Sequence, residues 1–203
     1  MIKAVIFDFG GVIKKSSTSS VRDIAAVYGI SKKILFQKMR RFLELFRKGL
    51  ISENQFWKEL SSDLNKPMPK NKNYLWRRRY EKSYYIYPSI LNFAKKLKAK
   101  GIKTAILSNT ISPHVEIISK KGGYKGFDVV VLSCNEGLQK PESEIYFLTV
   151  KKLNIKPKDC IFIDNKKQNL RPAKKLGMQT VLATNPRQII NEVSKIIDSL
   201  KRF

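Results

Sequence analysis

The sequence predicts an α/β protein with a Rossmann-like parallel sheet and a helical domain inserted after the first strand. Residues 4–7 form a short, continuous apolar run rich in β-branched residues, which is typical of a strand buried on both faces. From residue 86 onward, further apolar runs alternate with segments of helical periodicity, which indicates βαβ units. We therefore expect a core formed by residues 1–15 and 86–203, and a helical domain formed by residues 16–85.

The composition sets limits on the class of protein. With 203 residues and 42% hydrophobic content, the chain can form one core of ordinary size together with a smaller insert. No apolar run approaches the ~18 residues of a membrane helix, and Asp8 interrupts the first one. Two cysteines outside any paired motif suggest free thiols in a reducing compartment. We expect a cytoplasmic monomer or homodimer with no membrane partner.

The net charge is +25, from 41 basic and 16 acidic residues. Such a balance attracts anionic small molecules and can hold nucleic acid non-specifically. The basic residues are spread over nearly every expected helix and loop. A lysine-rich solvated surface is therefore the simpler interpretation, and non-specific binding of polyanions is the alternative.

The inserted segment has helical periodicity after a polar linker, residues 14–20, which we expect to lie outside the core. Helices are expected over residues 21–28, between Ser31 and Gly49, after Ser52, and over about residues 73–85. We expect the aromatic residues of the insert to form its core: Phe56, Trp57, Trp76 and Tyr80. The three consecutive arginines, residues 77–79, are expected on a solvated face.

The second half of the chain alternates helices and strands. Strands are expected over residues 103–107, 129–132, 160–163 and 180–183. Helices are expected over about residues 90–97, 113–121, 145–153 and 186–200, and a further helix is expected to end at Leu176, before Gly177. Right-handed crossovers would bring these strands into one parallel sheet with the first strand.

Polar side chains stand at the carboxyl ends of three of these strands: Asp8, Ser108 with Asn109, and Asp164 with Asn165. Parallel strands place these ends on one edge of the sheet, where ligands bind in open α/β folds. Lys140, in a loop before Pro141, can join them. Carboxylates, hydroxyl, amide and lysine together suit phosphoryl transfer to an aspartate with the help of Mg²⁺.

At this point the sequence resembles the haloacid dehalogenase-like (HAD) hydrolases, subfamily I, over essentially its whole length. The matching stretches are VIFDFGGVI at 5–13, AILSNT at 105–110, EGLQKPESEIY at 136–146 and CIFIDNKKQNLRPAKKLGM at 160–178. The helical insert is similar to the cap domain that this subfamily carries after its first motif. The sequence is also similar to sugar-phosphate phosphatases of the glucose-1-phosphate type and to the amino-terminal domains of epoxide hydrolases.

The resemblance implies a role for each matching residue. Asp8 would be the catalytic nucleophile that forms an aspartyl-phosphate, and Lys140 would neutralise the charge of Asp8 and of the phosphate. Ser108 and Asn109, with Lys140, would bind the phosphoryl oxygens. The metal ligands for Mg²⁺ would be Asp8, the carbonyl of Gly10, Asp164 and Asn165.

Two positions depart from the family pattern. Most phosphatases of the family have a second Asp, a general acid, at the position of Gly10, and such an acid contributes about 10²–10⁴-fold. Asn165 stands where an acidic residue is usual, so we expect weaker metal binding. The lone histidine, His114, is a candidate substitute acid, although a helix-start or surface histidine is the more ordinary interpretation.

The leading hypothesis is a Mg²⁺-dependent phosphatase acting on a small phosphorylated metabolite. One alternative is a 2-haloacid dehalogenase-like hydrolase, which uses the same nucleophile and needs no second Asp. The other is a catalytically weak protein of this fold that binds nucleic acid or an acidic partner through its basic surface.

Overall fold

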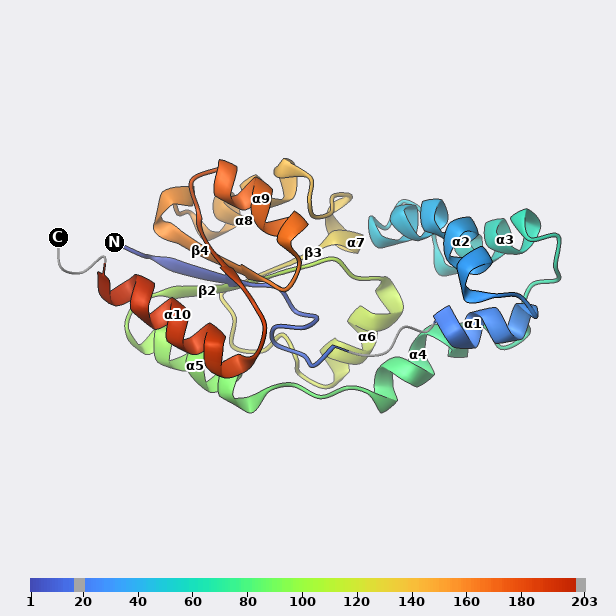
Figure 1. Ribbon diagram of the computed structural model, residues 1–203, viewed down its shortest axis with the longest axis horizontal. Helices are drawn as coiled ribbons and strands as arrows, with labels where there is room; N and C mark the ends of the chain where they lie inside the picture. Colours follow the sequence, from blue (N-terminus) through green and yellow to red (C-terminus); the bar gives the residue numbers. More distant parts are fainter. Residues whose placement is uncertain (17–20, 200–203) are drawn as a thin grey trace.

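Five parallel strands form the centre of the protein in the computed structural model, which describes residues 1–16 and 21–199 (Figure 1). Their order in the sheet is β3-β2-β1-β4-β5. The strands are β1 (Ala4–Phe7), β2 (Lys103–Ser108), β3 (Val129–Leu132), β4 (Cys160–Asp164) and β5 (Gln179–Leu182). The first strand is central and pairs with β2 on one side and β4 on the other. This arrangement brings the polar ends of β1, β2 and β4 together.

Helices cover both faces of the sheet, as the βαβ pattern predicts. Figure 1 shows α5 (Pro88–Ala99) and α10 (Pro186–Ser199) on one face, and α8 (Ser143–Leu153) and α9 (Lys167–Lys175) on the other. The second half of the chain contains three further helical segments: α6 (Ser112–Lys120), α7 (Ser133–Glu136) and the 3₁₀ turn η1 (Pro157–Asp159). The sequence did not predict α7 or η1, because neither is long enough to show a period.

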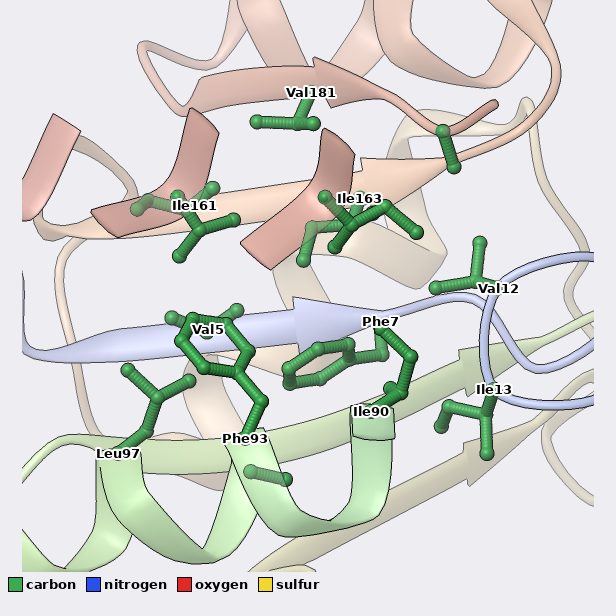
Figure 2. Packing of buried hydrophobic residues seen from close by; sticks show 14 of the residues in the cluster. Val5, Phe7, Val12, Ile13, Ile90, Phe93, Leu97, Ile161, Ile163 and Val181 are labelled. Atoms are coloured by element: carbon green, nitrogen blue, oxygen red, sulfur yellow. The ribbon is translucent and has the colours of Figure 1, made fainter. Parts of the chain in front are cut away.

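Alternate residues of each strand enter two separate apolar layers. Val5 and Phe7 pack with Ile161, Ile163 and the residues of α5, and Figure 2 shows Phe93 and Leu97 directed at them. The intervening residues, Ala4 and Ile6, pack in the layer beneath α8 and α9. All four residues of β1 are fully buried. The prediction of a strand buried on both faces is confirmed.

The inserted helices lie beyond the carboxyl ends of the strands (Figure 1). They are α1 (Val21–Tyr28), α2 (Lys32–Arg47), α3 (Glu53–Asp63) and α4 (Lys72–Lys82). Ser31 and Ser52 accept hydrogen bonds from backbone amides three residues later, as predicted for N-caps. The helix expected to reach residue 85 ends at Lys82. The division into core and cap stays a prediction, and the separate apolar cluster of these helices supports it.

Three expectations for side chains in and near the insert are wrong. Lys14 is 2% exposed, although the sequence placed it in a solvated linker. Tyr80 packs against the layer of α5 rather than with Phe56, Trp57 and Trp76, which do form the apolar core of the insert. Arg77 is not on a solvated face, because it binds Glu53 and Glu116. Residues 17–20 of the linker and residue 200 of the predicted last helix lie outside the described residues.

Salt bridges connect the inserted helices to the elements that surround the sheet. Lys48, after α2, forms a salt bridge of 2.5 Å with Glu142, and Arg77 of α4 reaches Glu116 of α6 at 3.1 Å. Both cysteines are free thiols, Cys160 buried and Cys134 half-buried, as predicted. Among the described residues, no helix combines the length and apolar character needed to span a membrane.

Candidate active site

Two carboxylates and one lysine meet at the carboxyl edge of the sheet. Asp8 follows β1, and Asp164 is the last residue of β4. The ammonium of Lys140 donates to Oδ1 of Asp8 at 2.6 Å, to Oδ2 of Asp164 at 2.8 Å and to the carbonyl of Leu107 at 2.7 Å. All three charged side chains are buried. The structure therefore brings together three of the residues that the sequence singled out, from three separate segments.

The amide of Asn109 holds the Lys140 loop in place. Its Nδ2 donates to the Lys140 carbonyl at 2.7 Å, and its Oδ1 accepts from the Lys140 amide at 2.8 Å. Ser108 is buried at the end of β2, directly after the carbonyl that receives the Lys140 ammonium. Asn109 thus positions Lys140, a contact that the sequence did not predict. The expected binding of phosphate by Ser108 and Asn109 stays a proposal.

Asp164 is fixed by two further donors. Asn169 of α9 donates through Nδ2 to Oδ2 of Asp164 at 2.9 Å, and the Lys166 amide donates to Oδ1 at 2.8 Å. With Lys140 included, three donors orient this carboxylate.

The site holds two negative charges against one positive charge. Burial raises the pKa of Asp8, the ammonium of Lys140 opposes this, and the nearby charge of Asp164 adds to it. A buried carboxylate pair is stable only with a counter-charge, and Lys140 supplies one. The remaining negative charge favours a bound cation.

Asn165 presents an oxygen suited to such a cation. Its Oδ1 is buried and accepts no hydrogen bond from a described residue. A Cβ on Gly11 would lie 2.2 Å from the Asn165 amide nitrogen, so glycine is needed there for the side chain to occupy this position. Two carboxylates and an amide oxygen form the kind of oxygen-rich donor set that Mg²⁺ prefers. Within residues 1–16 and 21–199, no three acidic, histidine or cysteine side chains are grouped so that they could hold a metal ion, so a cation here would also need amide or backbone oxygens.

His114 lies at the junction between α4 and α6. Its ring stacks on Tyr80 with centroids 3.8 Å apart, and its Nε2 is 3.3 Å from the carbonyl of Trp76. Burial lowers the pKa of His114 to about 4; the hydrogen bond to Trp76 opposes this, and positive charges nearby, from Lys14 first, add to it. At neutral pH the ring is uncharged. It is neither a surface histidine nor a ready proton donor.

Lys14 is the residue of this region that sequence reasoning missed. Its Nζ lies 4.7 Å from the centre of the Tyr80 ring and donates to the Lys15 carbonyl at 2.9 Å. Burial lowers the pKa of Lys14 to about 8. Lys14 is the first of two adjacent lysines that precede a run of hydroxyl residues and carries no periodic signal, so only the folded structure shows that it is buried.

The comparisons with known proteins agree with this fold. The family model of the haloacid dehalogenase-like hydrolases matches residues 2–177, and the chain belongs to that family. Acyl-CoA dehydrogenase family member 10 of Mus musculus is 28% identical over 96% of this chain and 19% of its own length. The chain spans about a fifth of the length of such longer relatives.

Other relatives match over most of both chains. The phosphorylated carbohydrates phosphatase of Thermotoga maritima is 25% identical over 89% of this chain and 84% of its own. A crystal structure of an HAD family enzyme from Bacteroides thetaiotaomicron, in complex with magnesium and inorganic phosphate, has a TM-score of 0.68 and 25% identity. It covers 91% of this chain and 96% of its own. The resemblance read from the four motifs is confirmed.

Proposed function

We propose that this hydrolase is a Mg²⁺-dependent phosphatase that acts on a small phosphorylated metabolite through an aspartyl-phosphate on Asp8. The observation that carries the proposal is the buried cluster in which the Lys140 ammonium binds both Asp8 and Asp164. A relative that dephosphorylates carbohydrates and a similar structure containing magnesium and phosphate support it.

In the proposed reaction, a carboxylate oxygen of Asp8 attacks the phosphorus and the ester bond breaks, so that the leaving group departs as an oxyanion, which takes its proton from solvent water. Water then attacks the same phosphorus, the bond to Asp8 breaks, and inorganic phosphate is released. Lys140 holds Asp8 in place and stabilises the phosphoryl oxygens as charge develops on them. Ser108 and Asn109 lie beside Lys140 and are proposed to hold those oxygens.

Mg²⁺ would be held by Asp8, the Gly10 carbonyl, Asp164 and Asn165, and would neutralise charge on the transferring group. Asn165 adds an oxygen but no charge, so the affinity is expected to be lower than with a carboxylate there. Asn169 and the Lys166 amide keep Asp164 oriented for this role.

Gly10 leaves the leaving group without a carboxylic acid beside the nucleophile. Neutral His114 does not replace it, because its pKa of about 4 leaves almost no protonated form at neutral pH. Esters with acidic leaving groups, which need no proton, are therefore expected to react much faster than alkyl phosphates.

Hydrolysis of p-nitrophenyl phosphate by the wild type and by Asp8→Asn, each with and without Mg²⁺, tests the proposal. We expect metal-dependent turnover in the wild type and a loss of at least about 10³-fold in Asp8→Asn. Asp159→Asn is the matched control, since Asp159 lies at the opposite edge of the sheet. There it forms a salt bridge with the exposed Lys3. Turnover that survives in Asp8→Asn would contradict the proposal.

Two measurements distinguish the alternatives. Halide release from a 2-chloroacid, without phosphate release from any ester, would favour dehalogenation. A salt-sensitive shift of a generic duplex, without either activity, would favour a polyanion-binding protein with net charge +25.

A further inference from the structure

Two basic side chains near the candidate active site, those of Lys14 and Arg47, form no salt bridge with a carboxylate of the described residues. Lys14 is 2% exposed, and its Nζ contacts the Lys15 carbonyl and the Tyr80 ring. In the part of the chain that the structure describes, no carboxylate lies within salt-bridge distance of this ammonium. Burying a charge without a partner is costly, so a residue of this kind calls for an explanation.

Arg47, the last residue of α2, is the second such cation. It is half-buried, and burial lowers its pKa. Glu44 opposes this shift from a distance, but the Arg47 guanidinium forms no hydrogen bond or salt bridge with any residue in 1–16 or 21–199. Its neighbours differ in this respect: Lys48 is paired with Glu142, and Arg77 is paired with both Glu53 and Glu116.

The charges of both cations act on the same pair of stacked rings, Tyr80 and His114. The charges of Lys14 and Arg47 both lower the affinity of His114 for a proton, and Lys14 also touches the Tyr80 ring. Tyr80 in turn lies within the electrostatic reach of Asp8. This stack is therefore close enough to both cations and to the proposed nucleophile for their charges to act on it.

Two buried hydroxyls in the same region have no hydrogen-bond partner among the described residues. The hydroxyls of Tyr84 and Tyr124 are buried and bond to no described residue. The Tyr84 ring lies 6.2 Å from that of Tyr80, and Tyr124 lies 5.4 Å from Phe9, the residue after Asp8. Two hydroxyls without a hydrogen-bond partner, and two cations without a salt bridge, indicate a place that an anion occupies.

We propose that Lys14 and Arg47 form a subsite for a second anionic group of the substrate, a carboxylate or a second phosphate. The substrate is then a phosphorylated acid or a bisphosphate rather than a neutral sugar phosphate. This inference rests on the proposed phosphatase function, because it assigns the phosphoryl group itself to Asp8 and Lys140.

Binding of stable phosphonates tests the subsite without turnover. Carboxyalkylphosphonates of two to six carbons are compared by calorimetry with hydroxyalkylphosphonates of equal length, in the presence of Mg²⁺. We expect the carboxylate to tighten binding by about 10- to 100-fold at the best length in the wild type. In Lys14→Met and in Arg47→Met, that preference falls below about threefold.

Matched variants remove an exposed charge of the same type: Lys15→Met beside Lys14, and Arg40→Met on α2. Both are expected to keep the wild-type preference, and thermal melting of all four variants identifies any that fail to fold. Arg47→Met keeps the test decisive if Lys14→Met unfolds. Equal preference in all variants, or no binding of any phosphonate, overturns the inference.

Hydrolysis of the corresponding phosphate esters separates the two failures. If hydroxyalkyl and carboxyalkyl phosphates are hydrolysed with equal kcat/KM, the phosphatase function stands and the second-anion subsite falls. If no ester is hydrolysed, the proposed function falls, whatever the phosphonates show.

Discussion

Two clusters of buried charge lie close together in this protein, and they differ in how the charge is compensated. In the carboxylate site (Asp8, Lys140 and Asp164), every charged group bonds to another, at 2.6 and 2.8 Å. In the cation pair (Lys14 and Arg47), neither group forms a salt bridge with a carboxylate of the described residues. The first cluster is arranged before substrate arrives. The second is complete only when an anion is bound.

The difference shows which part of a site the fold can stabilise by itself. Lys140 and the two carboxylates stabilise each other, so this geometry adds no large penalty to folding. Lys14 and Arg47 remain uncompensated, which lowers stability and leaves binding energy for a ligand. Four changes of sequence or pH test this comparison, from the largest expected effect to the smallest.

Lys140→Met removes the counter-charge from the carboxylate site. Two adjacent buried carboxylates then lack a partner, which is expected to lower the free energy of unfolding by about 3–5 kcal/mol. Turnover of p-nitrophenyl phosphate should fall by at least about 10²-fold. Chemical denaturation and initial rates measure the two effects, with the exposed Lys151→Met as control. A variant with wild-type stability would show that the cluster is not held by charge pairing.

Gly10→Asp supplies the missing acid. A Cβ at Gly10 meets no atom within 4 Å, so the side chain can be accommodated. We expect hydrolysis of alkyl phosphates to rise by about 10- to 100-fold, and that of p-nitrophenyl phosphate to change much less. Gly10→Asn has the same shape without the proton. An equal gain in that variant would show that the effect is not acid catalysis.

Acidification tests how the nearby positive charges affect protonation of His114. The ring stacks on Tyr80, and the charges of Lys14, Arg47 and Arg77 all act on it. The folded state binds the His114 proton at a pKa of about 4 and the unfolded chain at 6.5, so stability falls as pH drops between these values. For this half-buried ring we expect a loss of about 2 kcal/mol.

His114→Phe keeps an aromatic ring against Tyr80 and removes the titrating group. Urea denaturation from pH 7 to pH 4 should show a smaller loss of stability in this variant than in the wild type. Parallel curves would mean that His114 is not protonated on unfolding in this range.

Lys14→Met should make the protein more stable. The change replaces a buried, unpaired ammonium by an apolar group of similar length, and we expect a gain of about 1 kcal/mol at pH 7. Lys15→Met, which alters an exposed side chain, should change stability by less than about 0.5 kcal/mol. A clear loss of stability in Lys14→Met would indicate that the ammonium has a structural role.

Local sequence pattern determined the sheet and the placement of its polar ends. The alternation of Val5 and Phe7 with Ala4 and Ile6 serves two apolar layers, and such a pattern is visible in the sequence alone. Asp8 and Asp164 were predicted at the sheet edge because parallel strands end on the same side. Ser31 and Ser52 were recognised as N-caps for the same local reason.

Only the tertiary structure decided which side chains meet. Lys140 reaches Asp8 across 132 residues of sequence, and His114 stacks on a tyrosine from the inserted helices. Lys14 stands in a polar stretch that gives no sign of burial, yet it is buried where the returning chain pairs with this stretch at Tyr85 and Ile86. Periodicity predicts which face of an element is apolar. It does not predict which distant segment packs there, because that choice depends on the summed contacts of the whole fold.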